Sequence, residues 1–459
     1  MEKRGIPTVV LTRKEFVGAV RNTVAASGFA PEQAMVIFPV DQFLVESDLS
    51  PIKQNLDKFV EGLTQWGPTL KEKGRLKTTE VRIEGKDYEE AVAHMDKLFL
   101  RNLWGDGLPL LPPTKEHVSW ILSGIDISPD TEIVKIMPKG GIATVETLAV
   151  SLAMAGGRPE YLPVLIAAVK AIVKPEVHHH EWQATSSSVY PAVIVSGPIA
   201  KQIRLNSGFG LLGPDPQHPA GGSIGRALRL LQQNVGGAVP GIGTMAMFGG
   251  MRYTNAVFAE DEDGLPPGWE PLNVEYLGHL KGTNTLAVSP VSSATNILRR
   301  GTGKETLDEE ALTSLHIIAS HIRSFNVNGL PGYADGTPGI LLISGTVACQ
   351  LASLGWTKEE IRKFLWEESK IPLSELKRTG FLRWIEFLNL NGTLQDPWPI
   401  TSKAENFMIV VAGGRHPTHA YWMQSALAQR VVSTEINLPA NWDMLLKKAE
   451  EDLGPLPAN

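Results

Sequence analysis

Hydrophobic positions in the first 66 residues alternate between short continuous runs and helically spaced sets. Residues 7–11 and 34–40 are short apolar runs of the kind that form buried strands. Residues 14–27 and 52–66 place apolar side chains three and four positions apart, which predicts two amphipathic helices. This order is half of a doubly wound unit, Rossmann-like or flavodoxin-like. Because central parallel strands are covered and paired on both sides, we expect later parts of the chain, or another polypeptide, to supply the missing strands.

A polar, Lys- and Glu-rich stretch at 67–88 is the predicted linker to the rest of the chain. Helical and strand patterns alternate from 89 to 459, which indicates one larger α/β domain. The predicted helices are 88–104, 117–122, 145–155, 159–173, 224–235, 305–324, 357–369, 373–389 and 419–429; the predicted strands are 189–195, 255–259, 285–288, 339–343 and 408–412. The predicted fold class is α/β, with a partial doubly wound N-terminal unit joined to a larger mixed α/β domain.

Composition narrows the functional classes. The net charge of −6, without a basic tract, lacks the footprint of a nucleic-acid binder. There is no apolar run of 18 residues, which argues against a membrane span, and the start of the chain has no secretory pattern, so we expect a cytoplasmic protein. The single cysteine, Cys349, excludes an internal disulfide and a dithiol pair, and we expect it to be a buried small hydrophobic residue.

Several stretches, spread over nearly the whole chain, are similar to one protein family. The opening EKRGIPTVVLTRKEF resembles the later half of the UGSC proteins, which are named for a Sec- or Cys-Gly-Ser-Cys motif. The remainder resembles the large proteins that accompany or fuse to that family. The matching stretches are 105–118, 153–169, 183–203, 206–214, 223–241, 258–264, 269–275, 351–367 and 410–420.

The resemblance implies a function together with a partner. The Sec/Cys-Gly-Ser-Cys motif is absent from this chain, and Gly157 stands where the family usually has a cysteine. We therefore expect a small partner subunit to carry the motif. The chain would be the large subunit of a hetero-oligomeric enzyme, an oxidoreductase or lyase, that acts on a small anionic substrate by thiol- or selenol-assisted redox or carbon–heteroatom bond cleavage. The alternatives are a self-contained lyase or hydratase that uses His419 and Glu260, and a non-catalytic binding or scaffold subunit.

The Gly-rich segment 206–226 is the first candidate site. Asn206, Ser207 and Gly208 lie in a loop before a helix predicted to begin near Ser223, where free N–H groups suit a carboxylate or phosphate. Arg226, in the first turn, could clamp the same anion. The alternative is a capped helix whose arginine pairs with a neighbouring acid. The segment is neither a P-loop nor G-x-G-x-x-G, so no nucleotide cofactor is implied.

The segment 413–419 is the second candidate. It follows an apolar strand, and we expect a strand–loop–helix turn, where α/β proteins bind ligands. Gly413 and Gly414 would let a substrate approach, and His416 or His419 could act as general acid or base. The resemblance also places a histidine at 419. The alternative is a helix start with His419 exposed.

Further candidates come from charged and polar residues near predicted strands. Glu260, in the acidic run 260–263, is a candidate base, with a solvated turn as the alternative. Gln183 and Thr185 are candidate substrate contacts at a strand edge. Arg158 could bind an anion or cap a helix.

The histidine run 178–180 raises the question of a metal site. On an extended chain at most His178 and His180 would converge, so we favour a solvated loop over a metal site.

Overall fold

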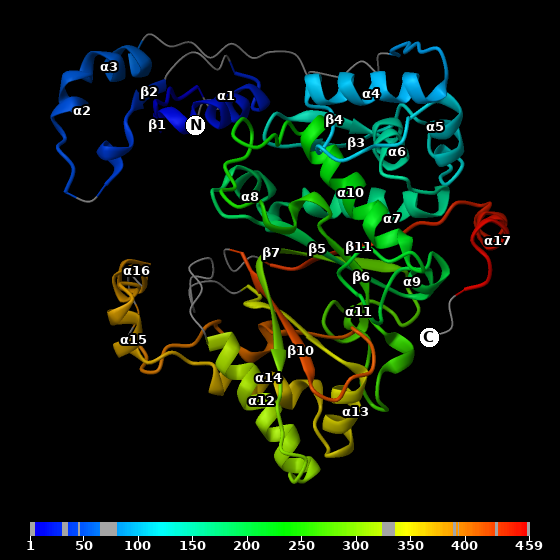
Figure 1. Ribbon diagram of the computed structural model, residues 1–459. Helices are drawn as coiled ribbons and strands as arrows, with labels where there is room; N and C mark the ends of the chain where they lie inside the picture. Colours follow the sequence, from blue (N-terminus) through cyan, green and yellow to red (C-terminus); the bar gives the residue numbers. More distant parts are fainter. Residues whose placement is uncertain are drawn as a thin grey trace.

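The computed structural model describes residues 5–29, 35–44, 46–64, 80–323, 336–388, 392, 394–426 and 430–456. The protein is mixed α/β, as the sequence predicts. Figure 1 shows a large body with a smaller N-terminal unit at one corner. Within the described residues, every helix is too short or too polar to cross a bilayer.

The N-terminal unit is a two-stranded parallel sheet with three helices. Its elements are β1 (Val10–Arg13), α1 (Val17–Ala26), β2 (Met35–Phe38), α2 (Ser50–Gln54) and α3 (Leu56–Thr64). The predicted strand–helix–strand–helix order is therefore confirmed, with the last helix broken into two. The side chain of Asn22 on α1 donates a hydrogen bond to the carbonyl of Ile242 (3.4 Å), which joins this unit to the body.

One sheet runs through the whole body in the order β6-β5-β7-β10-β8-β9, and β11 pairs with β7 beside β10. The pairs β5–β6 and β8–β9 are parallel, and the other pairs are antiparallel. The strands are β5 (Tyr190–Ser196), β6 (Ala256–Ala259), β7 (Thr285–Leu298), β8 (Gly339–Ile343), β9 (Met408–Val411), β10 (His419–Ser425) and β11 (Val432–Glu435).

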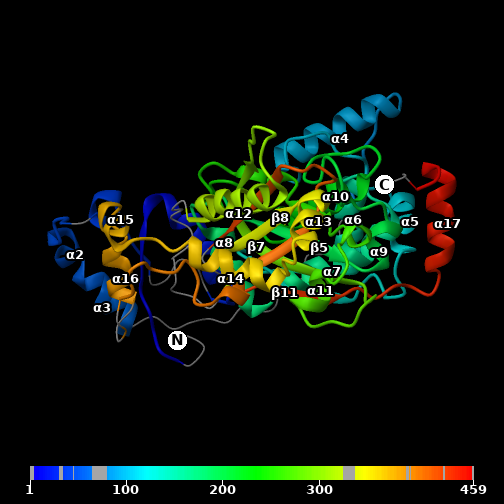
Figure 2. The same cartoon turned by 90° about the horizontal axis from the view of Figure 1, so that it is seen from below.

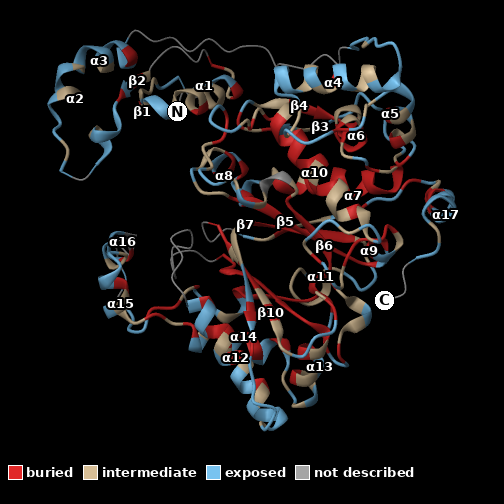
Figure 3. Ribbon diagram, in the orientation of Figure 1, coloured by how far each residue is buried: buried red, intermediate tan, exposed pale blue. Residues whose placement is uncertain are grey.

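The sheet is curled, so that alternate side chains enter different cores. The inner faces of β5, β6 and β7 share one apolar cluster with the inner faces of β8, β9 and β10. The outer face of the first three packs on one helical layer, and the outer face of the last three packs on another. Buried residues accordingly concentrate in the middle of Figure 3.

The two helical layers come from opposite halves of the body. The first layer contains α5 (Lys115–Leu122), α6 (Val145–Met154), α7 (Leu162–Ile172) and α10 (Pro219–Asn234). The second contains α12 (Leu307–Arg323), α13 (Gly345–Ser353) and α14 (Lys358–Glu368). Figure 1 shows these layers above and below the sheet.

The remaining elements lie around this frame. They are α4 (Tyr88–Asn102), β3 (Glu132–Ile136), β4 (Gly141–Thr144), α8 (His179–Ala184), α9 (Pro198–Gln202), α11 (Leu272–Glu275), α15 (Leu373–Arg378), α16 (Leu382–Leu388) and α17 (Trp442–Leu453). Figure 2, seen from below, shows that α15 and α16 project from the same side of the body as α2 and α3.

Several sequence predictions need correction. The predicted helix at 419–429 is wrong, because residues 419–425 form β10; Ala420 and Trp422 enter the second helical layer while Met423 enters the inner cluster, a period of two. The helix expected near Ser223 begins at Pro219. The elements β3, β4, β11, α8, α9, α11, α13 and α17 are absent from the predicted set, and β7 extends ten residues beyond its predicted end. Part of the predicted linker, residues 67–79, lies outside the described residues.

Substitutions at two glycines of α10, Gly222 and Gly225, test how closely this helix packs against its neighbours. A methyl group added at Gly225 would lie 1.9 Å from the carbonyl oxygen of Thr254, whereas one at Gly222 meets nothing within 4 Å. Gly225→Ala should therefore lower the free energy of unfolding by about 1–3 kcal/mol through overpacking. Gly222→Ala should be neutral or stabilise by up to about 1 kcal/mol, because alanine favours a helix. Denaturant unfolding measures both, and equal effects would contradict the close packing.

Candidate active site

Two candidate segments that are distant in sequence meet at the carboxyl ends of β6 and β9. The carbonyl of Asn206 accepts from the N–H of Ala259 at the end of β6 (2.9 Å). The carbonyl of Ser207 accepts from the N–H of Gly413, just after β9 (2.9 Å). The Asn206 side chain is buried and accepts from the N–H of Gly208 (2.8 Å), which fixes the loop locally. The structure thus brings Asn206, Ser207, Gly208 and Gly413 together.

The turn between β8 and α13 holds segment 413–419 by three carbonyl groups. Ser344 donates its N–H to the carbonyl of His419 (3.4 Å) and its hydroxyl to the carbonyl of His416. The N–H of Gly345 donates to the carbonyl of Gly414 (3.1 Å). The start of α13 therefore positions this loop with N–H groups that helices otherwise leave unpaired. We call residues 206–210, 260–264, 344–345 and 413–419 the loop cluster.

The two histidines of the loop cluster contact each other directly. Their Nδ1 atoms are 2.8 Å apart, and the Thr418 hydroxyl lies 3.1 Å from each. In a hydrogen bond at this distance, one Nδ1 donates and the other accepts. His416 is exposed and His419 is half-buried. Such a pair can pass a proton to or from a bound molecule.

Arg415 and Asp261 belong to the same cluster, and the sequence analysis did not single them out. A methyl group at Gly345 would lie 3.8 Å from side-chain atoms of both residues. Burial raises the pKa of Asp261, and the N–H of Gly264 and the charge of Arg415 partly oppose that rise. Arg415 is exposed, precedes His416 directly in the chain, and can bind an anion. The signal in the sequence that could have identified Arg415 as a site residue is its position between Gly414 and His416.

Glu260 is buried, and both of its carboxylate oxygens have hydrogen-bond partners. Its Oε2 accepts from the N–H of Leu272 (2.6 Å), and its Oε1 lies 3.4 Å from both the N–H of Val411 and the Lys358 ammonium. Burial raises its pKa, and Lys358 is the main opposing influence. The solvated turn expected for the acidic run is thus wrong at this position. We assign Glu260 a structural role and no longer retain it as the base.

Two arginines that the sequence offered as anion ligands already hold carboxylates. Arg226 makes a bidentate pair with Asp106 (2.7 and 3.0 Å), which is the structural alternative foreseen above. Arg158 pairs with Glu160 (2.6 Å) and Asp452 (2.9 Å), and so attaches α17 to the body. Each guanidinium has a structural partner, so we do not place the anion site at either.

Gln183 and Thr185 lie elsewhere, before the N-terminal end of β5, whereas the loop cluster follows the carboxyl end of its parallel neighbour β6. Gln183 is buried, and its Oε1 has no hydrogen-bond partner among the described residues. The hydroxyl of Thr185 accepts from the N–H of Ser187 (3.2 Å). These residues therefore do not join the loop cluster.

The histidine run lies at the start of α8 and not in a loop. His178 and His180 lie 3.3 and 3.7 Å from the carboxylate of Glu181. Within the described part of the chain, no three His, Cys, Asp or Glu side chains are grouped so that they would hold a metal ion. Cys349 is exposed on α13, so the expectation that it is buried is wrong.

Comparison of the chain with protein-family models, with curated proteins and with solved structures finds no match.

The buried ion pair of Glu260 and Lys358 leads to a prediction about stability. Lys358→Met should lower the free energy of unfolding by about 3–5 kcal/mol, because it leaves the Glu260 carboxylate buried without its cation. Lys363→Met is the matched control on α14. It removes an exposed pair with Glu359 (2.6 Å) and should cost less than about 1 kcal/mol.

The pH dependence gives an independent check of the same pair. Losing the cation raises the pKa of Glu260 further, so the folded state binds its proton more tightly than the unfolded state does. The stability of Lys358→Met should therefore fall more steeply than that of the wild type as the pH rises above the unfolded pKa of the carboxyl. The double variant with Glu260→Gln should lose this extra slope. Equal slopes in Lys358→Met and Lys363→Met would contradict the assignment.

Proposed function

We propose that the protein is an enzyme that acts on a small anionic molecule at the loop cluster. The observation that carries this proposal is the His416–His419 contact of 2.8 Å in an accessible loop fixed by the start of α13. Buried histidines often serve packing, but His416 is exposed, His419 is half-buried, and Arg415 precedes the pair in the chain. A cytoplasmic location is part of the same proposal.

The roles in the reaction follow from the groups present. Arg415 would bind the carboxylate or phosphate of the substrate, since its planar fork suits both anions. The histidine pair would move the proton, because imidazole can donate and accept near neutral pH. Asp261 would attract Arg415 to this site by its charge. This chemistry suits a lyase or hydratase, with the histidine pair in place of Glu260 as the base.

A second candidate function, thiol- or selenol-assisted redox or bond cleavage, depends on the expected small partner subunit. The exposed apolar side chains of the N-terminal unit favour such a partner. Leu11 on β1 and Ile37 on β2 are 43% and 49% exposed, and Val60 on α3 is 57% exposed. Within the described residues, β1 and β2 pair only with each other, so each has an outer edge that a partner strand can extend.

The two candidate functions lie at different places on the molecule. The N-terminal unit and α13 are at opposite ends of the body in Figure 1 and are also apart in Figure 2. The loop that contacts α1 at Ile242 continues to Met247, whose N–H donates to the carbonyl of Ser186 (2.9 Å). A partner on the N-terminal unit would thus bring its motif toward Gln183 and Thr185 and away from His419.

The acid–base proposal predicts a loss of turnover in His419→Asn. Small carboxylates and phosphomonoesters are incubated in D2O with the protein co-expressed with its partner, and deuterium at carbon is followed by NMR. We expect exchange with at least one compound, and His419→Asn should slow it by about 100-fold or more while the fold is kept. His321→Asn, at an exposed position on α12, is the control. Equal rates in His419→Asn and the wild type would remove the pair from the mechanism.

The partner proposal is tested by co-purification with a small protein that carries the Cys/Sec-Gly-Ser-Cys motif. We expect a stable complex, and Ile37→Glu should abolish it, because a charge would be buried at the contact. Leu280→Glu, at a side chain that is 82% exposed on the body, should leave the complex intact. A complex that survives Ile37→Glu would place the partner elsewhere.

A further inference from the structure

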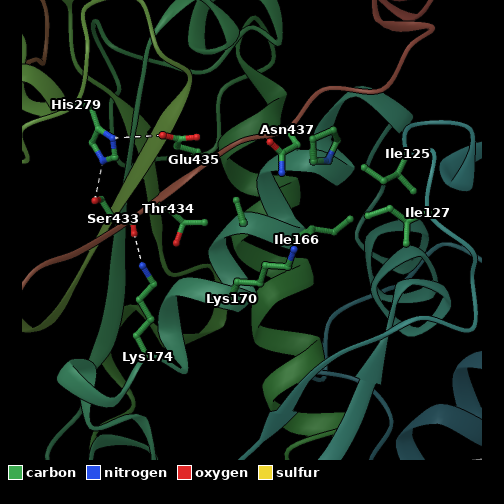
Figure 4. A pocket seen from close by; sticks show the side chains of 12 residues that line it. Ile125, Ile127, Ile166, Lys170, Lys174, His279, Ser433, Thr434, Glu435 and Asn437 are labelled. Carbon is green, nitrogen blue, oxygen red and sulfur yellow. Dashed lines mark hydrogen bonds and ion pairs between the residues drawn. The ribbon is translucent and has the colours of Figure 1, made fainter.

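A pocket of about 440 Å³ lies between α7, β11 and the chain that follows α5. None of the loop-cluster residues lines it. Its lining residues divide into an apolar group and a polar group, which we call the apolar wall and the polar wall; Figure 4 shows Lys170 of the polar wall beside Ile166 of the apolar wall. The apolar wall is formed by Ile125, Ile127, Pro163, Ile166 and Ala167; the polar wall is formed by Lys170, Lys174, His279, Ser433, Thr434, Glu435 and Asn437.

The polar wall contains groups that the described part of the protein leaves unpaired. Lys170, in the last turn of α7, makes no hydrogen bond or ion pair with any described residue. The hydroxyl of Thr434 is buried and likewise has no partner there. Buried polar groups are normally hydrogen-bonded, so the buried hydroxyl of Thr434 lacks a partner that a ligand could supply. Lys170 is half-buried, and its ammonium is available to pair with a charge in the same concave site.

The rest of the polar wall is already organised. Lys174 donates to the carbonyl of Ser433, and the Ser433 hydroxyl lies 2.8 Å from Nε2 of His279. Glu435 does not complete a serine–histidine–acid relay, because its carboxylate is 3.9 Å from Nδ1 of His279 and 65% exposed. This geometry suits binding and not nucleophilic catalysis, which requires an oriented base.

We propose that this pocket binds a small monocarboxylate with an apolar tail. The carboxylate would pair with Lys170 and accept from Thr434, and the tail would lie on the isoleucines. Glu435 on the same rim would repel a doubly charged phosphate, so a single negative charge fits better. At about 30 Å³ per water molecule the pocket has room for roughly fifteen waters, enough for the ten non-hydrogen atoms of octanoate.

The test measures octanoate binding to the full chain by calorimetry. We expect saturable binding, weakened at least tenfold in Lys170→Met, which removes the charge and keeps the chain length. Octanol, which has the same tail without the charge, should bind the wild type at least tenfold more weakly than octanoate. Lys58→Met, an exposed lysine on α3, should bind like the wild type.

A second variant separates the hydroxyl from the charge. Thr434→Val keeps the shape of the side chain, should leave thermal stability unchanged or higher because it removes an unpaired buried hydroxyl, and should weaken octanoate severalfold. Equal octanoate affinity in the wild type and Lys170→Met would overturn the proposal. So would an absence of saturable binding, or an equal loss in Lys58→Met.

Discussion

The contact between Glu260 and the end of β9 determines how the sheet closes on itself. β6 and β9 are the two outermost strands of the main path, yet Val411 of β9 donates to the Glu260 carboxylate and accepts from the N–H of Asp261. Lys358 neutralises the buried charge, and Leu272 supplies a further donor. Because the edge strands meet, the loops that follow them become neighbours, and the loop cluster exists as a consequence of this closure.

The elements with strong local periodicity could be predicted from the sequence. The strand–helix order of the N-terminal unit, the helices of both layers except α13, and the apolar strands β5, β6, β8 and β9 were visible as runs or as helical spacing. β10 was not, because HAYWMQS contains residues that suit either structure, and pairing with β7 and β8 decided the outcome. Tertiary pairing of this kind leaves no local signal.

The candidate site was predictable only in part, for the same reason. Gly-rich segments near strand ends showed where loops would lie, and two of these segments do meet. The partners of charged residues lie far away in sequence: Arg226 pairs with Asp106, and Lys358 with Glu260. A charged side chain therefore looks free in the sequence when it is not, as Arg226 and Glu260 show. Conversely, Arg415 was not predicted as a site residue, although it lies next to His416 in the sequence.

β7 has a consequence for the order in which the protein can fold. Its first half pairs with β5 and β11, and its second half pairs with β10, so one strand serves both helical layers. Its partners lie about a hundred residues before it and more than a hundred after it. Contacts of such long sequence separation slow folding, because the connecting chain must be ordered first. During synthesis, neither layer can complete its share of the sheet until β10 and β11 have left the ribosome, so the apolar edge of β7 needs protection from aggregation until then.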